Sequence, residues 1–90
     1  MPKRYFLERF TLVQMNKLRN TEQIAKFGER LRMLRTSKSL TLETLAFAAE
    51  VEVSQIHRIE KGKINPTYTT LLALSAALEI TISELVNIKD

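Results

Sequence analysis

The segment VSQIHRIEKGK, residues 53–63, holds the densest group of side chains in this 90-residue chain that could do chemistry. It contains the only histidine, His57, close to Ser54 and Arg58. A nucleophile needs an adjacent base and a metal ion needs several convergent ligands, but the sequence offers His57 no second histidine and no cysteine. We therefore expect no enzyme, no metal site and no cofactor. His57 then either contacts a binding partner or is simply exposed to solvent.

Apolar spacing around His57 predicts a short helix over residues 53–60. Ile56 and Ile59 would share its inner face, against a preceding helix in which Ala46 is small enough for close backbone approach. The polar side chains left on the outer face are Ser54, Gln55, His57 and Arg58. A short helix with a polar outer face on a rigid support is what the DNA major groove accepts.

Apolar residues recur at helical spacing through most of the chain, which contains only two glycines and two prolines. This pattern predicts an all-α domain over residues 21–90. Asn20-Thr-Glu-Gln23 resembles a capping box and predicts a helix start. The core stripe of that helix is Ile24, Phe27, Leu31 and Leu34, and Gly28 within it is expected to permit a close helix contact. Ser37-Lys-Ser39 is expected to end it.

The later helices are also marked by local signals. Their expected N-caps are Thr41, Thr67 and Thr81, the last within a capping box that ends at Glu84. Gly62 is expected to end the helix over residues 53–60. The turn before that helix requires a positive φ at Glu50, where glycine would be the unstrained residue.

The positive charge is concentrated at the start of the chain. Residues 1–20 carry five lysines and arginines against Glu8, which accounts for the whole net charge of +4, and residues 21–90 sum to zero. We treat residues 1–20 as a basic N-terminal arm, helical or not, ahead of a helix-turn-helix domain over 21–90. An anionic partner and a solvated basic face both fit this charge.

The apolar stretches are too short for a membrane span, which needs roughly 18 consecutive residues. Glu8 and Arg9 also interrupt the position where a secretory signal requires an unbroken apolar run. The absence of cysteine fits a reducing compartment. We expect a cytoplasmic protein with no membrane partner.

Several features between residues 24 and 86 occur together in one order and spacing. They are Leu45-Ala46, I-x-x-I-E-x-G-K over 56–63, Pro66, L-x-x-L-x-x-A-L-x-I over 71–80, and Arg35. In these features the chain resembles the phage-repressor-like helix-turn-helix family, also called the XRE family. The resemblance implies a five-helix, lambda-repressor-like fold. It also implies a DNA-binding protein, usually dimeric, with residues 53–60 as recognition helix.

The resemblance assigns roles by position. The positions that match base-reading side chains are Val53, Ser54 and Arg58, with Gln55 and His57 nearby on the outer helix surface for base or phosphate contacts. The loop positions that match phosphate contacts are Lys61, Lys63 and Asn65. Arg35 and Glu60 match a structural ion pair that ties the first family helix to the end of the recognition helix.

Three positions depart from the family pattern. Leu42 stands where a phosphate-binding glutamine is frequent, Glu50 where the turn often has glycine, and Glu52 where serine or threonine often caps the recognition helix. Residues 41–60 carry four glutamates against Arg58 alone, a net charge of −3. The acidic surface and Leu42 favour a second hypothesis, a protein-interaction module that retains the fold without reading DNA.

The first hypothesis is a sequence-specific transcriptional regulator of the repressor, controller or antitoxin type. It would bind a palindromic operator in double-stranded DNA as a homodimer, with residues 53–60 in the major groove. A protein partner is compatible with either hypothesis.

Overall fold

The computed structural model describes the backbone of residues 3–88 and the side chains of residues 11, 12 and 14–88. This part of the chain contains five helices and no strand. The helices are α1 (Lys3–Ser37), α2 (Leu42–Ala49), α3 (Val53–Glu60), α4 (Tyr68–Ala77) and α5 (Ile82–Leu85). The expected all-α, five-helix fold class is confirmed.

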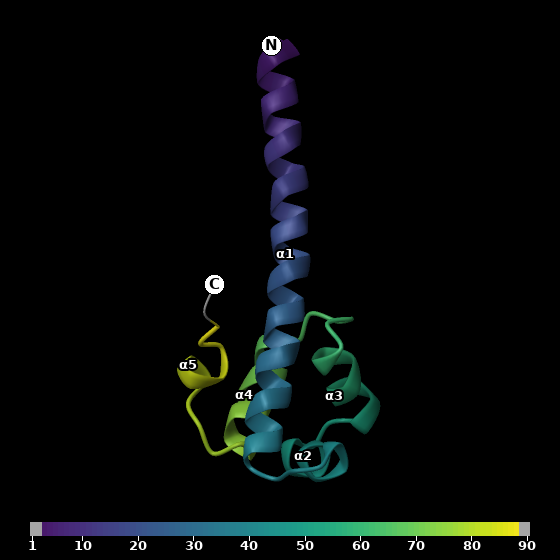
Figure 1. The fold of residues 1–90 in the computed structure, drawn as a ribbon, viewed down its shortest axis with the longest axis vertical. Coiled ribbons are helices and arrows are strands. Elements are labelled where there is room, and N and C mark those ends of the chain that lie inside the picture. Colours follow the sequence, from purple (N-terminus) through teal and green to yellow (C-terminus); the bar gives the residue numbers. More distant parts are fainter. Residues whose placement is uncertain (1–2, 89–90) are drawn as a thin grey trace.

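Helix α1 is far longer than the others, and only its C-terminal half lies against them (Figure 1). The molecule accordingly measures 55 × 23 × 19 Å. We call residues 3–20 of α1 the arm, and residues 21–88 the domain. The arm stands out from the domain as a straight continuation of α1 (Figure 1).

The core lies where the C-terminal half of α1 meets the other four helices. Its fully buried side chains are Leu31, Leu45, Ile56, Ile59, Leu74, Leu78 and Leu85. Each such side chain contributes roughly 1.5–3 kcal/mol relative to remaining exposed. Every helix supplies at least one of them, so the core fixes all five helices, including the short α3.

Three threonines begin three of the helices. The hydroxyl oxygens of Thr41, Thr67 and Thr81 accept hydrogen bonds from backbone N–H groups three residues later, at 3.0, 3.3 and 3.1 Å. Glu84 completes a capping box by accepting the N–H of Thr81 at 3.2 Å. The predicted N-caps of α2, α4 and α5 are confirmed, because these side chains satisfy amides that the first helical turn leaves unpaired.

The predicted helix start at residues 20–23 is wrong. Helix α1 passes through these residues without interruption. Thr21 points its hydroxyl back along the helix and donates to the carbonyl oxygen of Lys17 at 3.0 Å. That bond occupies the side chain within a helix interior, so it does not act as part of a cap. The predicted end near residue 37 is confirmed.

Gly28 lets α1 approach the end of α3 closely. A Cβ atom added there would lie 2.7 Å from the carbonyl oxygen of Glu60, and closer still to that of Ile59. No side chain larger than hydrogen fits at this separation. The expected close helix contact at Gly28 is confirmed, and it sets the position of α3 relative to α1.

Candidate nucleic-acid interface

A tight turn joins α2 to α3. Glu50 adopts φ 58° and ψ 42°, in the left-handed region, as its position in the sequence predicted. The N–H of Val51 donates to the carbonyl oxygen of Ala46 at 3.0 Å, which closes the end of α2. A non-glycine residue in this conformation carries a strain on the order of 1 kcal/mol. The turn brings α3 back across α2.

The inner face of α3 is anchored by its two isoleucines. Ile56 and Ile59 are fully buried, in the same apolar cluster as Ala46 and Leu45 of α2. With a buried inner face and a close contact to α1 at Gly28, α3 has little freedom to move relative to the other helices of the domain. Its opposite face is left to solvent.

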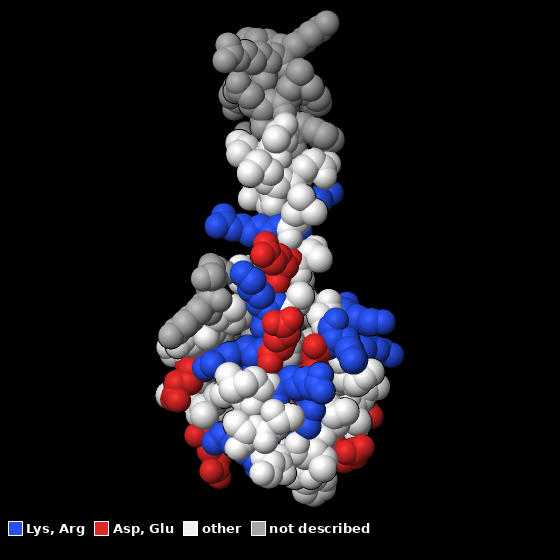
Figure 2. Space-filling view, viewed as in Figure 1, with Lys and Arg blue, Asp and Glu red and all other residues white. Residues whose placement is uncertain are grey.

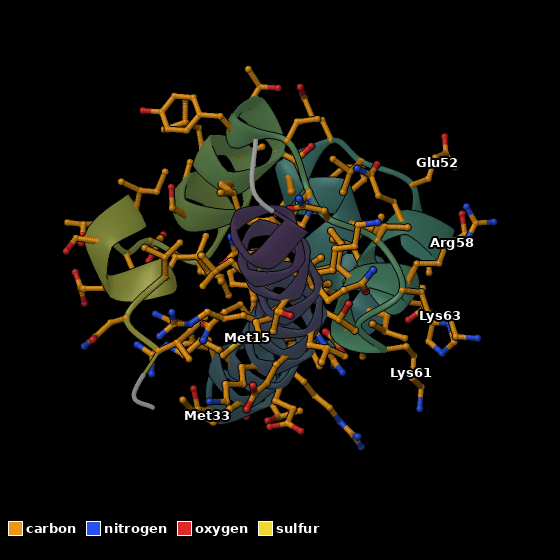
Figure 3. The ribbon with its side chains drawn as sticks, turned by 90° about the horizontal axis from the view of Figure 1, so that it is seen from above. Met15, Met33, Glu52, Arg58, Lys61 and Lys63 are labelled. Carbon is orange, nitrogen blue, oxygen red and sulfur yellow. The ribbon has the colours of Figure 1, made fainter. Side chains whose placement is uncertain are left out.

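The outer face of α3 carries polar side chains. Ser54, His57 and Arg58 are exposed there, and Lys61 is exposed just beyond the end of the helix. Val53, at the first turn of α3, is 37% exposed. Figure 3 shows Arg58, Lys61 and Lys63 directed away from the domain on the same side, with Glu52 near them. The structure thus brings together most of the residues that the sequence singled out.

Gln55 departs from the expected outward position. Its side chain is half-buried, and Nε2 donates to the hydroxyl of Thr70 on α4 at 3.5 Å. Ser54 is the second residue of α3, and the N-cap is Glu52, whose side chain makes no capping hydrogen bond. Ser54 therefore does not cap α3, and it lies on the exposed face.

Arg35 and Glu60 form an ion pair between the end of α1 and the end of α3. The Nε–Oε2 distance is 2.7 Å, and the Arg35 and Glu60 side chains are only 11% and 6% exposed. The hydrogen bond to Glu60 raises the pKa of Arg35 above its ordinary value. The pair locks the C-terminal end of α3 in place, and it removes Glu60 from the charge that the outer face presents.

A groove of about 220 Å³ lies beside the outer face of α3. It is lined by Arg32, Arg35, Leu42, His57, Glu60 and Lys61. Arg32 is an exposed cation that the sequence analysis did not single out. The sequence could have indicated that Arg32 is exposed. It directly follows the core residue Leu31, and adjacent residues on a helix point in different directions. Arg32, His57 and Lys61 are all suited to contact a phosphate group along this groove.

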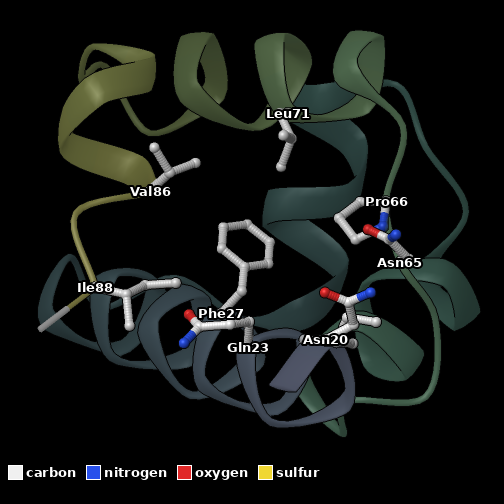
Figure 4. A pocket seen from close by; sticks show the side chains of 9 residues that line it. Asn20, Gln23, Phe27, Asn65, Pro66, Leu71, Val86 and Ile88 are labelled. Carbon is white, nitrogen blue, oxygen red and sulfur yellow. The ribbon is translucent and has the colours of Figure 1, made fainter. Parts of the chain in front are cut away.

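The loop after α3 divides its polar residues between two places. Lys61 and Lys63 are exposed beside α3, and Gly62 between them adopts φ 70° after the helix end. Asn65 instead lines a cavity of about 320 Å³ with Asn20 and Gln23 at its rim and Phe27 inside (Figure 4). Asn65 therefore lies toward α1, apart from the two lysines.

The glutamates of residues 41–60 do not combine into one acidic outer face. Glu60 is paired with Arg35, and Glu43 lies in the first turn of α2. Figure 2 shows lysine and arginine side chains gathered where α3 and its following loop lie, with acidic side chains lower on that side. The cations on this side of α3 are Arg58, Lys61 and Lys63, with Glu52 as an acidic neighbour.

Neither a metal-ligand cluster nor a membrane-spanning helix is found in the part of the chain that the structure describes. Among its described residues, no three His, Cys, Asp or Glu side chains gather as they would around a metal ion. None of the described helices combines the length and apolar character that crossing a membrane requires.

The match to known proteins covers the domain. A family model for the helix-turn-helix domain matches residues 26–86. This chain belongs to that helix-turn-helix family. The transcriptional regulator DdrOP3 of Deinococcus deserti is 38% identical over 60 residues, which cover 67% of this chain and 46% of that protein. The control protein C.MunI of a Mycoplasma species is 39% identical over 62 residues, covering 67% of this chain and 82% of that protein.

Solved structures of helix-turn-helix proteins match as well. The restriction-modification controller protein C.AhdI from Aeromonas hydrophila superposes with a TM-score of 0.68 and 44% identity, over 69% of this chain and 94% of that one. These similarities confirm the resemblance to the XRE family and the lambda-repressor-like fold. The helix-turn-helix match begins at residue 26, so the arm lies outside it.

Proposed function

We propose that this chain is a sequence-specific DNA-binding transcriptional regulator that inserts α3 into the major groove of double-stranded DNA. One observation carries the proposal. Helix α3 is fixed by two fully buried isoleucines and by the Arg35–Glu60 ion pair, while its outer face keeps Ser54, His57 and Arg58 exposed. A rigid helix with hydrogen-bonding side chains on its free face can match the pattern of donors and acceptors in the major groove.

The side chains have separate proposed roles. Arg58 and Ser54 form hydrogen bonds with base edges, and Val53 makes an apolar contact such as that with a thymine methyl group. Lys61, Lys63 and Arg32 contact phosphates, which contribute affinity without sequence preference. His57 lies between the two groups and contacts either a base or a phosphate. Gln55, held near Thr70, serves to position α3 more than to read bases.

The protein acts as a homodimer on a palindromic operator. A single α3 of eight residues covers only a few base pairs. Two copies related by a two-fold axis read two half-sites, which increases both affinity and specificity. The relatives that carry the names transcriptional regulator and control protein support this function for the domain they share. We expect it in the cytoplasm, where DNA is accessible.

The proposal is tested by selecting bound duplexes from a random DNA pool with the purified full chain. An inverted repeat should emerge, and binding to it should weaken steeply between about 50 and 200 mM salt, because phosphate contacts release counterions. The matched control is Arg58→Ala, which should enrich a less defined repeat. A protein-interaction module with the same fold would select no motif at any salt concentration, and that result would refute the proposal.

A further inference from the structure

Cationic side chains converge where the flank of α3 meets α1. The groove of about 220 Å³ at this place has three cations and one carboxylate in its lining, in addition to His57. The carboxylate, on Glu60, already accepts two hydrogen bonds from Arg35. The side chains of Arg32, His57 and Lys61 are exposed, and none of them forms an ion pair or a hydrogen bond with another residue that the structure describes. The groove therefore offers its positive charge to an anion from outside the chain.

The packing of α1 against α3 puts Arg32 beside this flank. Gly28 of α1 lies against the carbonyl groups of Ile59 and Glu60. Residues four apart lie on the same face of a helix, so Arg32 follows Gly28 by one turn on the side of α1 that faces α3. Arg35, three residues further along, makes the ion pair with Glu60. Arg32 therefore lies between two fixed contacts, which together set its position relative to α3.

His57 and Lys61 lie one turn apart on the same flank of α3. The N–H of Lys61 donates to the carbonyl oxygen of His57 at 3.0 Å, which closes the last turn of the helix. At about 100° per residue, His57 is turned roughly 60° around the helix from Ser54, toward the side that carries Glu60. Ser54 and Arg58 thus lie nearer the centre of the outer face, whereas His57 lies at its edge, toward α1.

The edge of a recognition helix is where the DNA backbone passes. The major groove is about 12 Å wide, and a helix with its side chains is about 10–12 Å across. A helix in the groove therefore presents its centre to the bases and its flanks to the phosphates on either side. With α3 in the major groove, a phosphate on the side of α1 meets Arg32, His57 and Lys61 together.

We propose that Arg32, His57 and Lys61 form one binding site for a backbone phosphate of DNA, and that His57 takes up a proton when the phosphate enters. The inference rests on the DNA binding proposed above and deepens it, since it assigns His57 to the backbone and adds a dependence on pH. Histidine is the side chain that exchanges its proton between about pH 5 and 8. A phosphate within about 4–6 Å favours the charged imidazolium. Because the complex then holds one more proton per copy than the free components, affinity increases as the pH falls.

The charged groups around His57 leave it without an anionic partner of its own. Those on the surrounding elements are Arg32 and Arg35 of α1, Glu43 of α2, Arg58 and Glu60 of α3, and Lys61 and Lys63 after it. Glu60 is bonded to Arg35, and Glu43 acts electrostatically on the same guanidinium group. Neither carboxylate is bonded to His57, so among the described residues none supplies the negative charge that a phosphate would bring.

Fluorescence anisotropy with the full chain tests the proposal, on the selected operator and on a random duplex, at about pH 8 and about pH 6 and constant ionic strength. The wild type should bind both duplexes at least about threefold more tightly at the lower pH, because a phosphate contact does not depend on sequence. His57→Gln should bind within about twofold of the wild type at the higher pH and lose the gain at the lower one. The α-amino group also titrates in this range, but it is the same in both proteins, so their difference isolates His57.

A permanent charge tests whether the proton causes the gain. His57→Arg should bind at about pH 8 at least as tightly as the wild type binds at about pH 6, and its affinity should change with pH no more than that of His57→Gln. Ala76→Arg is the matched control: it adds the same charge to an exposed position on α4 and should change affinity by less than about twofold. Circular dichroism at both pH values should show every variant folded.

Arg32→Ala tests whether the three side chains share one phosphate. It should reduce the slope of log K against log salt by about 1 on both duplexes. It should also diminish the gain at low pH, because the phosphate is no longer held beside His57. Arg32 and His57 act at separate places if Arg32→Ala keeps the full gain, and that result overturns the shared site.

The remaining outcomes separate the phosphate site from the reading of bases. Equal affinity of the wild type at both pH values overturns the proposal, as does a full gain in His57→Gln or an equal rise of affinity in Ala76→Arg and His57→Arg. A gain confined to the operator would place His57 on a base edge, which also overturns it. A selected inverted repeat without the gain leaves sequence-specific binding standing, whereas the gain on random duplexes without a selected repeat leaves the phosphate site standing. If neither duplex is bound at either pH, both proposals fail.

Discussion

Arg35 and Glu60 are joined by two hydrogen bonds, with Nε 2.7 Å from Oε2 and Nη2 3.0 Å from Oε1. The remaining nitrogen, Nη1, donates to the carbonyl oxygen of Leu40 at 2.8 Å. One guanidinium group therefore connects the end of α1, the turn that follows it and the last residue of α3. The orientation of the recognition helix depends on this connection as well as on apolar packing.

Replacement of Glu60 by alanine should lower the free energy of unfolding by about 3 kcal/mol, because it leaves a nearly buried guanidinium without its partner. Urea unfolding monitored by circular dichroism measures the change. Glu79→Gln is the control, since Glu79 is exposed and its replacement should stay within about 0.5 kcal/mol. A loss at Glu60 as small as that of the control would show that the ion pair behaves like a surface pair.

The close contact at Gly28 predicts that Gly28→Ala lowers stability, although the same replacement usually stabilises a helix. In an unobstructed helix interior, Gly→Ala stabilises by about 1 kcal/mol. Here the new Cβ would press on the carbonyl oxygens of Ile59 and Glu60, so Gly28→Ala should destabilise by about 1–3 kcal/mol. Thermal unfolding measures the effect. A higher melting temperature would mean that α1 and α3 separate at little cost, and that Gly28 does not fix α3.

Much of the domain could be predicted from local signals. Thr41, Thr67 and Thr81 each begin a helix because the hydroxyl group satisfies a free amide within the same few residues, so the signal requires no knowledge of distant structure. The positive φ of Glu50 followed in the same way from the length of the turn. The isoleucines at 56 and 59 could be assigned to the core because their spacing matches one helix face.

The continuity of α1 could not be predicted from the capping box at residues 20–23. The same residues that can cap a helix can also lie within one, and Thr21 does so by bonding to the carbonyl oxygen of Lys17. The position of Gln55 was missed for a different reason. Its partner Thr70 lies on another helix, so only the packing of α4 against α3 decides which way the side chain turns.

Glu50 provides a test of backbone strain. Because its φ of 58° favours glycine, Glu50→Gly should raise the free energy of unfolding by a few tenths to about 1 kcal/mol, after the greater unfolded-state entropy of glycine is subtracted. Thermal unfolding measures it. Glu50→Gln separates strain from charge, since it keeps the strained backbone and removes the carboxylate. If the glutamine variant is as stable as the glycine variant, the gain comes from charge and the strain contributes nothing measurable.

Arg58 and Lys63 should differ in the kind of binding energy they contribute. Arg58→Ala is expected to weaken binding to the selected operator by roughly 1–3 kcal/mol, relax preference at one base position and leave binding to random DNA less affected, because a base contact exists only on the correct sequence. Lys63→Ala should weaken both kinds of binding similarly and reduce the slope of log K against log salt by about 1, as the loss of one phosphate contact does. Fluorescence anisotropy with operator and random duplexes at several salt concentrations separates the two patterns. If Arg58→Ala lowers binding equally on both duplexes, Arg58 contacts the phosphate backbone, and the direct reading of bases must come from Val53, Ser54 or His57.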